Sequence, residues 1–259
     1  MTTVRIVHLY PRELGINGDR GNVLALHQRL EWRGVAAEVL EVGPGEALPN
    51  DADIVVIGSG PQSALDAVNV DARRHAQALR DHLGAGGALL AVGAGMHVLA
   101  REHSDRDGAM REGVDVLPVT VAAASRRRVG EVLGLPDTAV GGEVATRFAG
   151  FVNHGVTLDV LDDATPLTQL DRGFGNDREA REGAPAAEGV RVGLAVGTHL
   201  HGPVLPMNPS LADELLSAAL LRHGSSLPPA DERIRHADDM ARRSRAAIAA
   251  RLGRSGVSV

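Results

Sequence analysis

The sequence predicts an α/β protein built on a parallel, doubly wound sheet. Two apolar runs, DIVVIG at 53–58 and ALLAV at 88–92, are continuous, as strands are when helices cover both faces of a sheet. Segments with helical spacing separate such runs over the first hundred residues, which is typical of parallel β-α-β units. Hydrophobic residues make up 44% of the chain but aromatics only 2%, so the core consists mainly of Val, Leu, Ile and Ala.

The other elements of this half follow the same alternation. Strands are expected at 4–9, 37–42 and 190–196, and helices at 22–32, at 71–83 and directly after the strand at 88–92. The segment 117–175 differs, because it contains short β-rich pieces with turn residues and little helical period. It predicts an antiparallel extension of the sheet.

The carboxyl-terminal part reads as a loop followed by helices. GAPAAEG at 183–189 is expected to be a surface loop, and Asn208 to cap a helix that has Pro209 at its first position. We place one α/β domain at 1–224 and a helical extension at 225–259. The apolar face of the extension is thin, which suits either a surface helix or a docking element.

Composition removes several classes of function. The 27 Lys and Arg residues are outnumbered by 33 Asp and Glu, so the chain lacks the basic surplus of a nucleic-acid-binding protein. No apolar stretch has the length of a membrane span, and the amino-terminal segment enters a strand pattern directly, so we expect a cytoplasmic protein. The absence of cysteine excludes disulfides, thiolate metal sites and thiol nucleophiles.

One turn has the sequence of a nucleophile elbow. The strand ALLAV runs into Gly93 and a helix, with the small residues Ala91 and Gly95 two positions either side. By itself this is more often an ordinary Gly-rich turn. A histidine just past a late strand, His201, gives the chain order of a nucleophile–base pair on a parallel sheet, whose sites lie at strand carboxyl ends.

Four segments carry a family resemblance. LYPRELGINGDRGNVLALHQRLEWRG (9–34), FVNHG (151–155), GFGND (173–177) and GTHLHGPVLPMNP (197–209) resemble the glutaminase subunits of lipid II isoglutaminyl synthases. These belong to the cobyric acid synthase-like branch of class I glutamine amidotransferases. The resemblance covers roughly 4–222. It implies a flavodoxin-like sheet and a partner subunit resembling a Mur ligase, which activates a carboxylate with ATP.

The resemblance also assigns roles to residues. His201 falls on the catalytic histidine, and Arg127 on an arginine that holds the glutamine carboxylate, although Arg126 or Arg128 could take that place. The other substrate-side positions are Gly60, Ala94, Asn153 and His154. Where the family reads Ala-Val-Cys-Gly-Gly, this chain reads Ala-Val-Gly-Ala-Gly, so Gly93 stands at the nucleophile's position.

The replacement removes the family's chemistry. Glutamine hydrolysis in this family proceeds through attack of a thiolate on the side-chain amide, and Gly93 has no side chain. Loss of the nucleophile from such a pair typically costs about 10⁶-fold in rate. Ser59, in the turn after the strand at 53–58, is the nearest other candidate, but we expect it on the wrong wall of the site. We therefore predict that the chain is inactive as a glutaminase.

The histidines and one turn suggest other sites more weakly. His97, His154, His199 and His201 could meet at one rim, and a His-rich pocket can hold a metal. No acidic ligand stands at a diagnostic spacing, so we expect no metal and no cofactor. The turn at 17–22 could bind an anion through its backbone amides, but it has no dinucleotide or Walker pattern.

Three functions remain open at this stage. The first is a non-catalytic member of an amidotransferase-type complex, bound to a Mur-ligase-like ATP-dependent ligase. The second is an enzyme that uses the His-rich pocket on a new substrate. The third is a sensor that binds glutamine or a related amino acid. We favour the first, because the turns and strand ends that carry the resemblance are kept while no new acid, base or metal set is recognisable.

Overall fold

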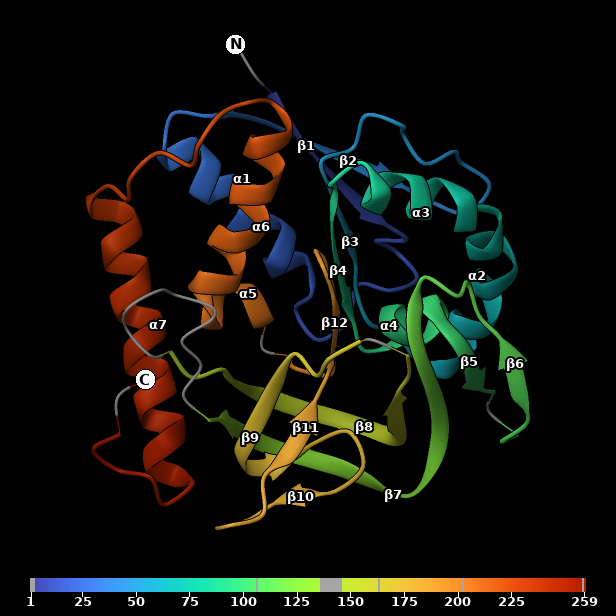
Figure 1. Ribbon diagram of the computed structural model, residues 1–259, viewed down its shortest axis with the longest axis vertical. Coiled ribbons are helices and arrows are strands. Elements are labelled where there is room, and N and C mark those ends of the chain that lie inside the picture. Colours follow the sequence, from blue (N-terminus) through green and yellow to red (C-terminus); the bar gives the residue numbers. More distant parts are fainter. Residues whose placement is uncertain (1–2, 106, 136–145, 163, 202, 258) are drawn as a thin grey trace.

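The computed structural model describes residues 3–105, 107–135, 146–162, 164–201, 203–257 and 259. They form two sheets (Figure 1), of which the first has six strands in the order β12-β13-β4-β3-β1-β2. All neighbouring strands in it are parallel except the edge pair β12 and β13. The strands are β1 (Thr3–Leu9), β2 (Ala36–Val42), β3 (Ile54–Ile57), β4 (Ala88–Val92), β12 (Val190–Val192) and β13 (Ala195–Thr198). The doubly wound parallel sheet predicted from the sequence is thus confirmed.

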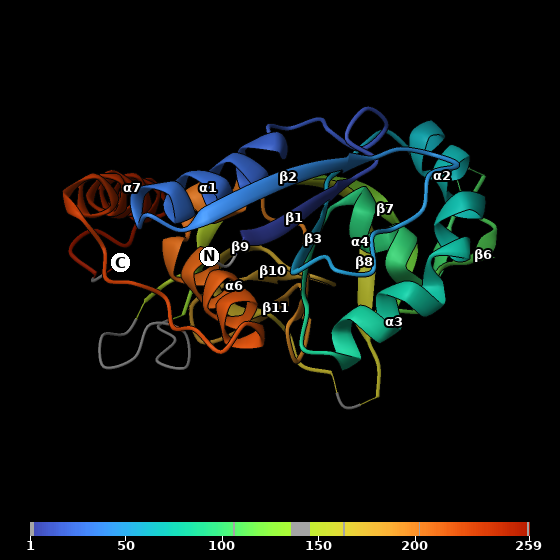
Figure 2. The same cartoon turned by 90° about the horizontal axis from the view of Figure 1, so that it is seen from above.

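Helices cover both faces of this sheet (Figures 1 and 2), which explains the continuous apolar runs. Leu90 of β4 belongs to the core shared with α1 (Arg20–Trp32) and α6 (Pro209–Arg222). Its neighbour Leu89 points to the opposite core, shared with α2 (Gln62–Arg74) and α3 (Ala76–Gly84). Because successive side chains alternate between the two cores, every position of the strand is apolar.

Two predicted elements are each divided in the structure. The helix expected at 71–83 is the end of α2 and the whole of α3, which meet at His75, and α2 begins nine residues earlier, at Gln62 after Pro61. The Gly-Pro pair at 60–61 reads as a loop, although proline also suits a helix start. The strand expected at 190–196 is a hairpin of β12 and β13, in which Gly193 turns the chain with a φ of 54°.

The second sheet lies at the carboxyl ends of the first (Figure 1) and confirms the antiparallel extension. Its strands are β5 (Ala100–Ser104), β6 (Met110–Glu112), β7 (Leu117–Gly134), β8 (Ala149–Val160), β9 (Thr168–Phe174), β10 (Glu179–Ala180) and β11 (Ala186–Glu188). The expectation of a surface loop at 183–189 is wrong at its end. There β11 pairs with β9, and Glu188 is buried.

The carboxyl-terminal helices pack against both layers. The predicted cap of α6 is wrong, because the Asn208 side chain instead bonds the backbone N and O of Ala149 and the carbonyl of Val204, at the start of α5 (Val204–Met207). The long helix α7 (Glu232–Arg251) packs Ile248 against β7 and β8. Treating 225–259 as a separate extension remains our proposal.

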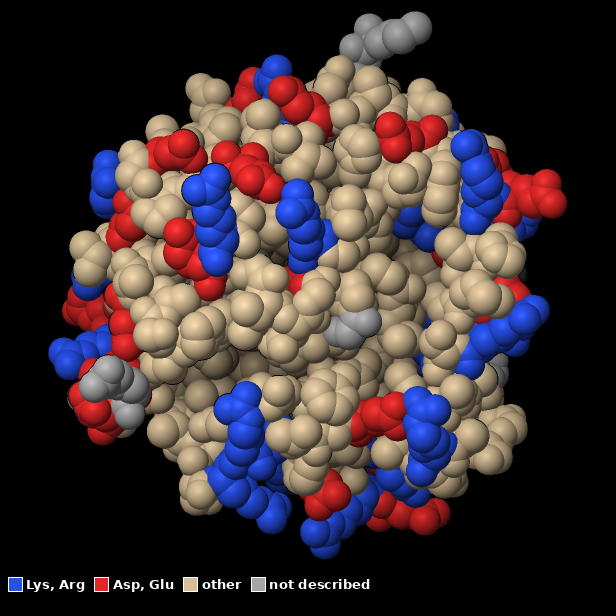
Figure 3. Space-filling model, turned by 180° about the vertical axis from the view of Figure 1, so that it is seen from behind, with Lys and Arg blue, Asp and Glu red and all other residues tan. Residues whose placement is uncertain are grey.

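Charged side chains of both signs are interspersed on the face opposite to that of Figure 1, around a largely uncharged central area (Figure 3). This matches the nearly balanced composition of the chain. None of the helices in the described part of the chain is both long enough and apolar enough to cross a membrane.

The glycine after the elbow is required by close packing. A Cβ at Gly95 would lie 2.6 Å from the carbonyl oxygen of Gly58 and 2.8 Å from that of Ile57, at the end of β3. We expect Gly95→Ala to lower the free energy of unfolding by about 1–3 kcal/mol, because backbone cannot give way as a side chain can. Gly84→Ala is the control, since nothing lies within 4 Å of its Cβ position. Equal urea midpoints for the two variants would contradict the packing argument.

Candidate functional site

A cavity of ≈ 580 Å³ lies where the carboxyl ends of the parallel strands face the second sheet. Open α/β sheets place their sites at this end, because the loops after the strands converge there. The cavity contains the residues that the sequence singled out from distant segments. Its lining includes Ser59, Gly60, Gly93, Ala94, His97, Arg127, Asn153, His154 and His201, whereas His199 lies behind it.

Gly93 forms a sharp turn between β4 and α4 (Ala94–Leu99). Its backbone angles are φ 53° and ψ −117°, a conformation that side chains rarely tolerate, and its N–H donates to the Thr198 carbonyl at 2.8 Å. A Cβ on Gly93 would lie 3.1 Å from Cε1 of His201. The turn therefore has the shape of a nucleophile elbow that faces an imidazole, but it carries no nucleophile.

His201 is fixed by its backbone and faces a buried acid. Its N–H and C=O pair with those of Phe151 at 2.7 and 3.2 Å, which joins the first sheet to β8. Its Nδ1 lies 3.6 Å from Oδ1 of Asp19, which is fully buried, and neither atom has a hydrogen-bond partner among the described residues. A carboxylate in this place can orient an imidazole, as the acid of a catalytic triad does.

Asp19 was missed from the sequence. It lies in the turn at 17–22, which the sequence suggested could bind an anion, and its Oδ2 accepts a hydrogen bond of 2.6 Å from the N–H of Ser59. A buried carboxylate in this turn disfavours an anion beside it, and anion binding here stays an untested prediction. The only signal in the sequence was an acid within a Gly-rich turn, which is usually a surface residue.

Ser59 lies closer to the elbow than we expected. Its Oγ is 2.3 Å, and its Cβ 2.9 Å, from the point where a Cβ on Gly93 would sit. The N–H of Ala94 donates to the Ser59 hydroxyl at 3.3 Å. The side chain therefore lies beside the elbow, because β3 and β4 are adjacent and the turns that follow them meet.

The three consecutive arginines have different surroundings, which settles which of them lines the cavity. The guanidinium of Arg127 faces the cavity and donates to the side-chain oxygen of Asn153 at 2.7 Å. Arg128 is buried and donates to the backbone carbonyls of Val156, Asn176 and Asp177. Arg126 lies over the ring of Phe174, 5.9 Å from its centroid. A cavity ligand with a carboxylate would thus meet Arg127.

Three histidines form a closely packed group behind the elbow. The Nε2 atoms of His97 and His199 are 2.9 Å apart, so one ring donates a proton and the other accepts it. The His199 ring also stacks on that of His154, with centroids 4.0 Å apart. Burial, followed by the neighbouring His154, lowers the pKa of His97 to about 3, and burial followed by Arg128 lowers that of His154 to about 4.

These rings are neutral near pH 7. Among the residues whose placement is described, no group of three or more His, Cys, Asp or Glu side chains is arranged to hold a metal ion. The buried Glu188 fixes the backbone of His199, because its carboxylate accepts hydrogen bonds from the Thr198 hydroxyl and the backbone N–H of His199. Burial raises the pKa of Glu188 to about 7.

The neutral histidines make stability depend on pH. The pKa of His97 is 6.5 in an unfolded chain but about 3 here, so unfolding below pH 6.5 takes up a proton. The folded state therefore loses stability as the pH falls from 6.5 toward 3, by on the order of 2 kcal/mol at pH 5 for this one ring. We expect His97→Gln to reduce the difference in urea-unfolding free energy between pH 7 and pH 5. An unchanged difference would show that His97 is not held neutral.

The shape of the sheet and the elbow facing a histidine define an amidotransferase-like α/β domain. Residues 5–209 match the CobB/CobQ-like glutamine amidotransferase domain, and the chain belongs to this family. This confirms the resemblance seen in the sequence.

Two curated relatives are similar over most of their length. Both are named as lipid II isoglutaminyl synthase (glutamine-hydrolyzing) subunit GatD. The protein of Staphylococcus aureus is 28% identical over 230 residues, which cover 88% of this chain and 89% of the relative. That of Streptococcus pneumoniae is 27% identical over 219 residues, covering 84% and 80%. Among solved structures, PurLQS from Thermotoga maritima matches with a TM-score of 0.55 and 16% identity, over 86% of this chain and all of that chain, which supports the fold.

Proposed function

We propose that this chain is a glutamine amidotransferase-like subunit that has lost thioester chemistry and acts as the non-catalytic partner of a Mur-ligase-like ATP-dependent ligase. The observation that carries the proposal is Gly93, a residue without a side chain, at the elbow that faces His201. No other part of the 259-residue chain supplies a thiol, because it contains no cysteine. His201 consequently has no thiol to deprotonate.

The partner is inferred from the relatives and from what the chain retains. Both curated relatives are named as subunits of a synthase that hydrolyses glutamine, so an assembly is the usual setting of this domain. The pairing of His201 with Phe151 keeps the two sheets joined, and Arg127 and Asn153 keep the cavity wall ordered. A domain kept for binding needs this framework but not the nucleophile. From the names of these relatives we infer that the complex amidates a cell-wall precursor.

The second function, a new enzyme in the His-rich pocket, has less support. His97 and His199 bond to each other, and burial lowers the pKa of both, so both are weak bases near pH 7. A new enzyme would need a further acid, base or metal in the cavity, whereas a non-catalytic subunit needs none.

Affinity purification from the native host tests the proposal. We expect a tagged chain to retain an ATP-dependent ligase encoded next to it, in stoichiometric amount on gel filtration, and His201→Ala to retain it equally. A matched variant with three exposed arginines of α7 changed, Arg235, Arg242 and Arg243, checks for non-specific charge-driven capture. Recovery of a monomer without any ligase, under conditions that preserve other complexes of the host, would refute the partner role.

A further inference from the structure

We infer that the Ser59 side chain occupies the space that a nucleophile on Gly93 would fill, and that it blocks the elbow amide from binding a carbonyl ligand. The Ser59 Oγ and Cβ lie 2.3 and 2.9 Å from the position of a Cβ on Gly93, far inside contact distance. A side chain at 93 and the present side chain at 59 therefore exclude each other. The absence of a side chain at 93 and the presence of serine at 59 are therefore sterically coupled.

The backbone of Ser59 leaves little freedom to relieve this overlap. Its N–H donates to the buried Asp19 carboxylate at 2.6 Å, and its carbonyl accepts from the N–H of Ile16 at 3.0 Å. Rotation about the Cα–Cβ bond moves Oγ but not Cβ, and Cβ alone is too close to position 93. A side chain at 93 therefore requires the turn at Ser59 to shift, unless the side chain at 59 is removed.

The Ser59 hydroxyl also occupies the position where the carbonyl oxygen of a ligand would accept a hydrogen bond. The N–H of Ala94, the first residue of α4 after the elbow, points at the Ser59 Oγ at 3.3 Å. In acyl-transfer sites an amide next to the elbow receives the oxyanion, so Ser59 takes the donor that a substrate carbonyl would need. Ser59 is nine-tenths buried and lines the cavity beside Gly93 and Ala94.

The contacts favour an occupant over a replacement nucleophile. A nucleophilic hydroxyl has to give its proton to a base, and among the described residues the Ser59 hydroxyl bonds the Ala94 amide and makes no hydrogen bond to an imidazole. The inference rests on the assignment of Gly93 to the nucleophile's position, which the proposed function shares. It adds that Ser59 also takes the Ala94 amide from a ligand carbonyl, which the missing thiol alone would not do.

A single cysteine placed at 93 reports on the overlap, because the chain has no other cysteine. We compare Gly93→Cys with Gly93→Cys/Ser59→Gly, and use Gly93→Cys/Ser63→Gly, at an exposed serine, as the matched control. The probe is iodoacetamide, whose carbon forms a bond to the sulfur of the introduced cysteine while iodide leaves and the thiol proton passes to solvent. Intact mass spectrometry follows the second-order rate of labelling.

We expect Ser59→Gly to raise the labelling rate of the introduced cysteine roughly tenfold or more, with Ser63→Gly without effect, since residues in contact couple strongly and separated ones do not. If Gly93→Cys fails to fold, the same comparison is made by melting temperature on Gly93→Ala, where Ser59→Gly should recover stability that Ser63→Gly does not. Within each comparison the residue at 93 is the same, so the backbone strain that it causes cancels.

Two results would overturn the inference. The first is equal labelling, or equal melting temperature, with and without Ser59→Gly. The second is an acetyl group found on Ser59 of the otherwise unchanged protein after treatment with p-nitrophenyl acetate, which would make Ser59 a nucleophile. Neither result bears on whether a ligase co-purifies, so failure here is distinguishable from failure of the proposed function.

Discussion

The purified protein, alone or with a ligase partner, should release no glutamate from L-glutamine above the buffer blank. The thioester route needs a thiolate at the elbow, and Gly93 offers none. Removal of a nucleophile from such a site lowers the rate by about 10⁶-fold, and only binding and oxyanion contributions remain. Here Ser59 takes the Ala94 amide as well, so part of that remainder is also lost.

A coupled glutamate dehydrogenase assay over hours, at high protein concentration, measures this directly. His201→Ala serves as the control and should give the same blank rate as the unchanged protein. Glutamate release that His201→Ala abolishes would show that the site hydrolyses glutamine by a different nucleophile.

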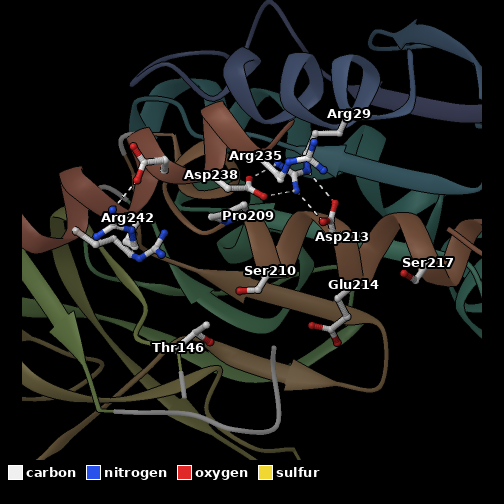
Figure 4. A pocket seen from close by; sticks show the side chains of 12 residues that line it. Arg29, Thr146, Pro209, Ser210, Asp213, Glu214, Ser217, Arg235, Asp238 and Arg242 are labelled. Carbon is white, nitrogen blue, oxygen red and sulfur yellow. Dashed lines mark hydrogen bonds and ion pairs between the residues drawn. The ribbon is translucent and has the colours of Figure 1, made fainter. Parts of the chain in front are cut away.

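The second large effect is on stability. Arg29 of α1 is buried at the junction with α6 and α7 (Figure 4), where it binds the Asp213 carboxylate with two hydrogen bonds and that of Asp238 at 2.6 Å. Replacement by methionine leaves the Asp238 carboxylate without its cation and Asp213 with Arg33 alone, which bonds its Oδ2 at 2.8 Å. We expect Arg29→Met to lower the free energy of unfolding by about 3 kcal/mol, because breaking a buried ion pair strands its charged partners.

An exposed arginine of the same helix gives the matched control. The Arg20 side chain is 73% exposed and lies 3.5 Å from Glu41, so Arg20→Met should cost less than about 1 kcal/mol. Urea unfolding with an unchanged m-value measures both variants. Similar losses for Arg29→Met and Arg20→Met would mean that water reaches the Arg29 cluster and weakens it.

Much of the site could be predicted from the sequence because its residues stand at the ends of strands. Apolar runs identify the strands, parallel strands share one edge for their carboxyl ends, and so Gly93 and His201 were expected to meet. The resemblance supplied Arg127 and Asn153, which line the same cavity and bond to each other. Contacts that follow from the order of the strands in a parallel sheet can therefore be predicted from the sequence.

Other features needed the tertiary structure because no local pattern encodes them. Glu188 reads as part of a surface loop, and only the pairing of β11 with β9 buries it, where its carboxylate accepts from the N–H of His199. Asp19 and Ser59 stand forty residues apart in Gly-rich turns, where polar residues are usually solvated. Their meeting at the elbow depends on how two adjacent turns fold over one another.

By itself, the sequence determined that this protein has the doubly wound sheet of its family and lacks any thiol for that family's chemistry. Composition fixes the absence of cysteine, and the alternation of apolar runs and helices fixes the layers, since each depends on neighbouring residues only. Only the tertiary structure decided what fills the vacated position. That outcome rests on ångström-scale distances between the turns after β3 and β4, which place the Ser59 hydroxyl where the nucleophile's side chain would be.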